Sequence, residues 1–353
     1  MKDIESRKER WRSFLQPAAE QGFQFYVRFN DPAANLPPAQ PPWPERQAER
    51  VEHIWAAYQH SVEQAAWLED DSVPSLNMMT GTEIFAESFG CKVHKPTDSN
   101  PFALPLIHSA SEVAALAVPD LSTSTLAYLF DMADELQRRA GPDAVFHLVD
   151  VQSPMDIAAL IWEKSSFFMA ILEEPEAVKE LAAKVYQFQT AFLDEWFGRY
   201  GTEFVAHYPD YFMSGGMTLS EDEAGSVNAE IFEDLFLPEL AALSKRYGGI
   251  GMHCCADARH QWANFKKIPG LRLLNLNNPP ARDPDTYVSL AYDFFADHCV
   301  QWHYGWAPPG SLSDQARGFA PGSRVVLEAA ANSREEARRL CEEMQALRSA
   351  SST

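Results

Sequence analysis

Short apolar runs that end in polar residues recur from residue 145 onward, with helical patterns between them. A period near 3.6 predicts helices over residues 122–139 and 175–199, because their apolar positions then fall on one face. This alternation predicts an α/β chain with a mainly parallel sheet, and we expect a (β/α)8 TIM barrel. A Rossmann-type sheet gives similar alternation, but no G-x-G-x-x-G follows any predicted strand. The strand-like runs are residues 145–149, 203–206, 249–252, 271–274, 300–302 and 324–327.

Polar side chains stand at the ends of these predicted strands. In a (β/α)8 barrel the carboxyl ends of the strands share one face, so we expect these side chains to converge on one site. Asp150 and Asp222 are candidate acids or bases, or partners that orient a histidine. His207 and His303 are candidates for proton transfer, with a hydrogen-bonded core histidine as the alternative. The candidates for cofactor binding are Tyr208, Asn277 and Trp306.

The tripeptide His253-Cys254-Cys255 ends one of the apolar runs and offers a metal two ligands on one short turn. A zinc site, a reactive thiol and buried packing residues all fit this pattern, since free cysteine is often buried. Adjacent residues of a strand face opposite sides. We therefore expect His253 and Cys255 to share a face as zinc ligands, and Cys254 to pack.

The first 50 residues differ from the rest because they include a proline-rich run at 36–44. Proline at this density disfavours both helix and central strand. We expect an N-terminal arm or lid over residues 1–50, with a disordered linker as the alternative, and a single barrel domain over residues 51–353. The acidic stretch 214–226 is expected to be a flexible loop that shapes the substrate pocket.

Composition narrows the choice of function. The 353 residues, 46% of them hydrophobic, are enough to bury a barrel-sized core. The formal net charge of −21 makes nucleic acid an unfavourable partner, since phosphate binding needs a cationic surface. The sequence shows neither a membrane span nor a secretory signal, which predicts a cytoplasmic location. Five cysteines without a disulfide framework agree with a reducing compartment.

Several segments resemble the uroporphyrinogen decarboxylase superfamily, in the same order, over roughly residues 80–340. The fold of this superfamily is a (β/α)8 barrel, so the resemblance implies the fold that the alternation predicts. The resembling segments are Glu221–Ser226, Phe232–Leu240 and Met252–Ala256, supported by Val151–Asp156, Phe167–Met169 and Glu173–Glu176.

One branch of the superfamily comprises corrinoid-dependent methyltransferases, whose zinc is held by His-x-Cys and a later Cys. His253 and Cys255 match the first two positions, and at the later position this chain has Glu328, a carboxylate that zinc accepts. The resemblance thus implies a zinc-dependent methyltransferase with His253, Cys255 and Glu328 as ligands. Its expected partners are a small methylated substrate or thiol and a protein that carries the corrinoid, and it is expected to form a homodimer.

Two other functions stay open from the sequence. Uroporphyrinogen decarboxylases act without cofactor and grip a polycarboxylate with arginines near the amino terminus, where this chain offers Arg28 alone. A decarboxylase-like lyase predicts several arginines in the pocket. A non-catalytic binding barrel predicts no metal, and the absence of the later Cys motivates it.

Overall fold

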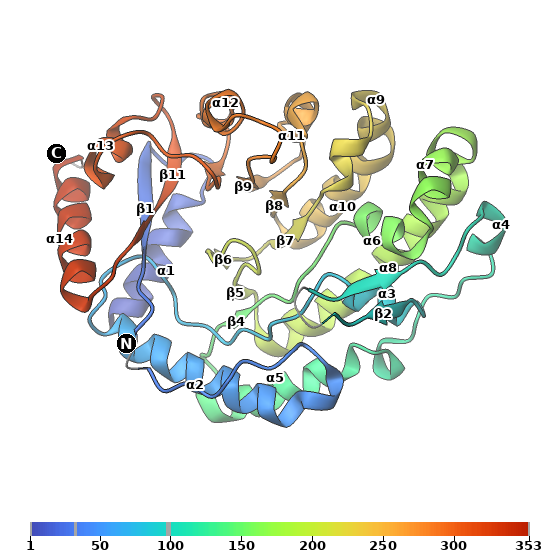
Figure 1. The fold of residues 1–353 in the computed structure, drawn as a ribbon, viewed down its shortest axis with the longest axis horizontal. Coiled ribbons are helices and arrows are strands. Elements are labelled where there is room, and N and C mark those ends of the chain that lie inside the picture. The colour runs from blue at the N-terminus through green and yellow to red at the C-terminus, as the bar shows by residue number, and fades with distance from the viewer. Residues whose placement is uncertain (1, 32–33, 97–99, 352–353) are drawn as a thin grey trace.

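The computed structural model describes residues 2–31, 34–96 and 100–351, and its centre is a parallel sheet with the strand order β1-β11-β10-β9-β8-β7 (Figure 1). Smaller sheets are formed by β4-β5-β6 and by β2-β3. The strands are β1 (Gly22–Arg28), β2 (Lys92–His94), β3 (Phe102–Leu104), β4 (Phe146–His147), β5 (Glu203–Val205), β6 (Phe212–Ser214), β7 (Met217–Ser220), β8 (Ile250–Cys254), β9 (Leu271–Leu276), β10 (Val300–Gln301) and β11 (Arg324–Ala330).

Backbone pairing closes this sheet into a ring. The Asp71 N–H donates to the Phe25 carbonyl of β1 at 3.0 Å. Leu76 pairs in parallel with Phe146 of β4, and the same chain segment continues to Gln152, which pairs in parallel with Ser220 of β7. The architecture is therefore the predicted (β/α)8 TIM barrel, with polar strand ends on one face.

Helices surround the ring of strands (Figure 1). The start of α6 shows why the chain turns there: the Ser153 side chain accepts from the Asp156 N–H, and Pro154 occupies the first turn. No described helix has the length and apolar character that crossing a membrane requires. The helices are α1 (Lys2–Phe14), α2 (Gln47–Ala65), α3 (Ile84–Ser88), α4 (Ala110–Val113), α5 (Ala127–Ala140), α6 (Pro154–Ile161), α7 (Lys164–Glu173), α8 (Pro175–Tyr200), α9 (Ala229–Ile231), α10 (Leu237–Tyr247), α11 (Trp262–Phe265), α12 (Val288–Phe294), α13 (Leu312–Arg317) and α14 (Arg334–Ser351).

The N-terminal segment differs from the expected arm over residues 1–50. Its β1 pairs with β11 along all seven residues of the strand, from Gly22 opposite Arg324 to Arg28 opposite Ala330. In α1 the Trp11 side chain is fully buried and donates to the Asp71 carbonyl at 2.8 Å. Among the described residues, the segment between α1 and β1 and most of the proline-rich run at 36–44 have no regular structure. The strand was missed because it lies close to that proline run, and the two were interpreted together as one arm.

A β-hairpin occupies the middle of the ring, where Figure 1 shows β5 and β6. Consecutive residues on both of its strands are buried, so both faces of the hairpin are covered. The flexible loop expected over residues 214–226 was a wrong prediction, because residues 217–220 form β7, a strand of the barrel wall. The hairpin tip, residues 207–210, therefore emerges among the strand ends that carry the candidate site.

Candidate metal centre and active site

Three potential metal ligands meet at the carboxyl ends of β7 and β8. The ligand atoms of Asp222, His253 and Cys255 lie within 4.8 Å of one another, and this is the single such group in the described part of the chain. His253 belongs to β8, Cys255 directly follows β8, and Asp222 follows the neighbouring strand β7. The two residues of the predicted His-x-Cys pair are thus on one side, as strand alternation requires.

The orientation of His253 is fixed by Asn275 of β9. The Asn275 Nδ2 donates to the Trp302 carbonyl, which leaves its Oδ1 to face the imidazole. That oxygen lies 2.5 Å from the His253 Nδ1, so Nδ1 carries the proton and Nε2 keeps a free lone pair. Burial lowers the pKa of His253 and favours the neutral ring. A neutral imidazole held through its other nitrogen is the usual state of a metal-binding histidine.

Asp222 is placed by the backbone around it. The Cys255 N–H donates to the Asp222 Oδ1 at 2.6 Å, which ties the end of β8 to the end of β7. Asp156 of α6 accepts from the N–H groups of Asp222 and Glu223 at 2.8 and 2.9 Å. Burial, with the neighbouring Glu221 and Asp222 charges, raises the pKa of Asp156 well above its usual range. These contacts hold the carboxylate of Asp222 against the cysteine and histidine.

The donor set fits zinc. Imidazole nitrogen, thiolate sulfur and carboxylate oxygen are its usual ligands, and three protein ligands leave a fourth position for substrate. Burial and the nearby Asp222 carboxylate raise the pKa of Cys255 to about 12, so the thiol keeps its proton unless a cation is present. A divalent cation here would relieve the repulsion between the Asp222 carboxylate and the thiolate.

The structure does not bring Glu328, the third ligand expected from the resemblance, into this group. Its carboxylate pairs with Arg28, with 3.2 Å between the Glu328 Oε1 and the Arg28 Nε. Arg28 also pairs with Asp210 at 3.1 Å. Because β11 is separated from β8 by β10 and β9, a residue at its end lies across the barrel mouth from His253. Among the described residues, the acid whose ligand atom lies with those of His253 and Cys255 is Asp222.

His207 and Asp150 form a pair at the hairpin tip. The His207 Nε2 lies 3.3 Å from the Asp150 Oδ2, and the His207 Nδ1 has no hydrogen-bond partner in the described chain. Burial disfavours the charged imidazole, but the Asp150 hydrogen bond and charge outweigh it and raise the pKa of His207. A histidine with one nitrogen on a carboxylate and the other free has the arrangement of a general base or acid.

Tyr208 lies over the group of Asp222, His253 and Cys255 (the metal group), whereas Trp306 lies elsewhere. The Tyr208 ring is 4.7 Å from that of His253, edge to face, and the side chain is 41% exposed. Asn277 is hydrogen-bonded to Tyr208, and its buried Oδ1 has no partner among the described residues. Trp306 donates to Asp285 at 2.6 Å and packs against Tyr292. The assignment of these three residues to cofactor binding stays a prediction.

His303 is held within the barrel wall. Its Nδ1 accepts from the Leu276 N–H at 3.0 Å, and its Nε2 lies 2.9 Å from the Gln301 Oε1. Burial lowers the pKa of His303 to about 3. With both nitrogens occupied, the ring matches the alternative of a hydrogen-bonded core histidine and has no free atom for proton transfer.

A cavity of about 380 Å³, the mouth cavity, lies beside the hairpin tip, between Asp210 of that tip and residues such as Arg28 and Asn77. Its walls include Tyr26, Asn77, His147 and Asp210, and its one arginine is Arg28, which is already paired with Asp210 and Glu328. The volume suits a small substrate, and the lining does not suit a molecule with many carboxylates.

Two supporting residues were absent from the candidates that the sequence yielded. Asp156 has a recognisable signal, since it is the one acid within the apolar helix PMDIAALI, where a charge needs a partner. Asn275 stands inside an apolar strand for the same reason. Both are identified by asking why a polar side chain interrupts a buried element.

Comparison with known proteins agrees with this barrel. The family model described as uroporphyrinogen decarboxylase (URO-D) matches residues 43–282. The chain therefore belongs to the uroporphyrinogen decarboxylase family. Among solved structures, a methyltransferase from Methanosarcina mazei is similar in fold, with a TM-score of 0.64 and 10% sequence identity over 98% of this chain and 99% of that one. Among curated proteins, none matches this sequence.

Proposed function

We propose that this protein is a zinc-dependent methyltransferase that moves a methyl group between a small methylated substrate or thiol and a corrinoid on a partner protein. The observation that carries the proposal is the group of Asp222, His253 and Cys255, whose ligand atoms lie within 4.8 Å of one another. Zinc bound there would lower the pKa of a substrate thiol so that the thiolate exists at neutral pH. The methyltransferase fold of the Methanosarcina mazei protein supports the same class.

His207 and Asp150 supply the proton chemistry that such a transfer needs. In the neutral ring the Nε2–H faces the Asp150 carboxylate, which leaves the lone pair on Nδ1. When a substrate thiol loses its proton, Nδ1 accepts it, and Asp150 stabilises the resulting imidazolium. Tyr208, next to His207 in the hairpin tip and edge to face against His253, brings this base to the metal group.

Decarboxylation of a polycarboxylate is the less favoured alternative. It requires arginines that converge in the pocket, and the mouth cavity contains Arg28 with two acidic partners. Neutralising several substrate carboxylates with one arginine that is already paired is unfavourable.

Metal content tests the proposal and its ligand set together. Elemental analysis of protein purified without chelator is expected to find about one zinc per chain. Asp222→Asn and Cys255→Ser are expected to lose it, because each removes an anionic ligand from the group. Glu328→Gln is the matched control, since it removes a carboxylate that pairs with Arg28, and it is expected to keep the zinc.

Two outcomes contradict this assignment in different ways. Loss of zinc in Glu328→Gln and retention in Asp222→Asn would restore the ligand set that the sequence predicts. Absence of metal from the wild-type chain would refute the zinc mechanism and favour a binding barrel or a lyase. With zinc present, methyl transfer to a thiol is then assayed with methylated corrinoid as donor, and its loss in His207→Gln tests the base.

A further inference from the structure

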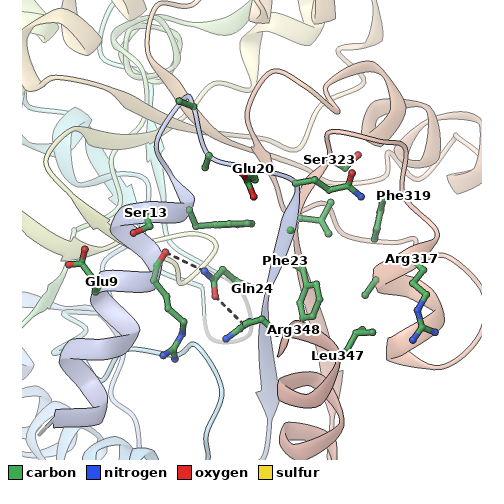
Figure 2. A pocket seen from close by; sticks show the side chains of 18 of the residues that line it. Glu9, Ser13, Glu20, Phe23, Gln24, Arg317, Phe319, Ser323, Leu347 and Arg348 are labelled. Atoms are coloured by element: carbon green, nitrogen blue, oxygen red, sulfur yellow. Dashed lines mark hydrogen bonds between the residues drawn. The ribbon is translucent and has the colours of Figure 1, made fainter. Parts of the chain in front are cut away.

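A second and larger cavity, of about 1060 Å³, lies at the starts of β1 and β11, away from the metal group, and Figure 2 shows it from close by. It is bounded by α1, by the first residues of β1, by the start of β11 and by the helices α13 and α14. Since β1 and β11 run parallel and reach the barrel mouth at Arg28 and Glu328, the residues at their starts are a strand length away from it. Neither the metal group nor the mouth cavity shares a residue with this space.

One part of the cavity wall is apolar and largely aromatic. Figure 2 shows Phe23 and Phe319 facing into the cavity from β1 and from the segment that follows α13. Phe14, Val325 and Leu347 extend this surface. Flat aromatic walls favour a planar apolar body, which gains burial and ring contacts together.

About half of the residues that line the cavity have polar or charged side chains, and not all of these side chains have hydrogen-bond partners. Ser323 is 2% exposed, yet its hydroxyl has no hydrogen-bond partner among the described residues. A buried hydroxyl without a partner has lost its hydrogen bonds to water and forms none within the protein. A ligand atom that bonds to it is therefore favoured. This orphaned hydroxyl distinguishes the cavity from a gap between packed helices.

The charges around the cavity leave one cation available. Arg10 and Arg348 both pair with the buried Asp71. Glu9 pairs with Arg12 at 3.0 Å. Arg317 of α13, in contrast, forms no ion pair within 4 Å in the described part of the chain, although its charge acts on Asp314 of the same helix, and its side chain borders the cavity in Figure 2. A guanidinium in that state favours an anionic group on the ligand.

We propose that this cavity binds an amphipathic organic anion, a molecule with a planar apolar body and one anionic group. The body lies between Phe23 and Phe319, and the anion lies on Arg317. Ser323 bonds to a polar atom of the body. Glu20, which Figure 2 shows away from Arg317, favours a hydrogen-bond donor there and disfavours a second anion. The cavity therefore favours a ligand with its anionic group at one end, on Arg317, and a hydrogen-bond donor at the other end, near Glu20.

Two fluorescent probes test the proposal, because they share rings and an N–H group and differ in one sulfonate. Anilinonaphthalene sulfonate carries the anion and phenylnaphthylamine does not. Titration of the full chain is expected to show one site for both, with tighter binding of the sulfonate. Arg317→Gln is expected to weaken the sulfonate about tenfold, the usual effect of losing a charged hydrogen bond, and to leave the neutral probe unchanged.

Further variants separate this site from general stickiness. Ala316→Trp places a large side chain on a residue that lines the cavity and is expected to block both probes. Arg138→Gln is the matched control, since Arg138 is an exposed arginine on α5, outside the cavity, and it is expected to bind both probes like wild type. Melting temperatures confirm that each variant is folded.

The location of the bound probe is checked by hydrogen–deuterium exchange, which does not depend on any variant. The sulfonate probe is expected to slow exchange in α13 and α14 and to leave the loops after β7 and β8 unchanged. Equal affinity of the two probes in wild type, or an Arg317→Gln chain that binds the sulfonate as tightly as wild type, overturns the anion site. Protection confined to the barrel mouth overturns the cavity assignment.

Discussion

At the scale of single residues, three histidines of the barrel differ in charge because their partners differ. Burial lowers the pKa of His147 to about 4 and that of His303 to about 3. His207 is half-buried, and although burial lowers its pKa, its hydrogen bond to Asp150 raises the pKa above the ordinary value of 6.5. One carboxylate therefore decides which imidazole can carry a proton near neutral pH.

The Asp150 carboxylate also links the stability of the fold to pH. Because the folded pKa of His207 is raised, its contribution to stability is complete below pH 6.5 and is lost as the pH rises through the folded value. In Asp150→Asn the two largest raising causes are gone and only the Asp210 charge still opposes burial, so we expect burial to lower that pKa. The contribution then reverses sign, and stability is lost as the pH falls below 6.5.

Urea unfolding of wild type and Asp150→Asn at a series of pH values from about 5 to 8 measures this difference. The effects of His147 and His303 are expected in both proteins, so they cancel in the comparison. Curves that stay parallel across the range would show that Asp150 does not hold the proton on His207. An NMR titration of the His207 ring then reports the pKa directly.

At the scale of elements, the hairpin of β5 and β6 depends on close packing against the barrel wall. Gly251 of β8 faces Tyr211, and a methyl group at Gly251 would lie 1.7 Å from the Tyr211 hydroxyl oxygen. Tyr211 is fully buried and cannot move away without disturbing its neighbours. The glycine is therefore required by the approach of the hairpin to the strand.

Gly251→Ala is expected to destabilise the fold by about 1–3 kcal/mol, the usual cost of overpacking a core. Adding Tyr211→Phe removes the clashing oxygen and is expected to recover part of this loss. Gly198→Ala on α8 is the matched control, because nothing lies within 4 Å of the added methyl group. It is expected to raise stability by about 0.5–1 kcal/mol. Equal melting temperatures for Gly251→Ala and wild type would contradict the packing argument.

The same elements show which parts of the site the sequence could predict. His253 and Cys255 were identified because the ligand spacing lies within one strand end. The third member, Asp222, lies 33 residues before Cys255 and is close only because β7 and β8 are neighbours. Since β7 was predicted as a loop, that neighbourhood was hidden, and Glu328 was assigned in its place. Residue pairs that the order of the strands brings together can be predicted only when the topology is known, because the sequence pattern alone does not give that order.

At the scale of the whole molecule, the barrel is predictable because its strand and helix periods repeat, but its closure is not. The ring closes between β11 and β1, and β1 comes from the segment expected to be an arm. Arg7 shows how deeply this segment is integrated. Its guanidinium is fully buried and donates to the carbonyls of Ala65 and Leu68 at 2.8 and 2.7 Å. We therefore infer that α1 and β1 are integral to the barrel domain.

Removal of residues 1–50 tests this view against the arm. The fragment 51–353 lacks β1, so β11 becomes an open edge strand, and the buried Arg7 and Trp11 leave their partners exposed or unpaired. We expect the fragment to aggregate or to keep helical circular dichroism without cooperative thermal unfolding, whereas the full chain unfolds cooperatively. A removable arm would instead leave a fragment that melts cooperatively near the temperature of the full chain. That result would mean that the pairing of β1 with β11 contributes little to the free energy of unfolding.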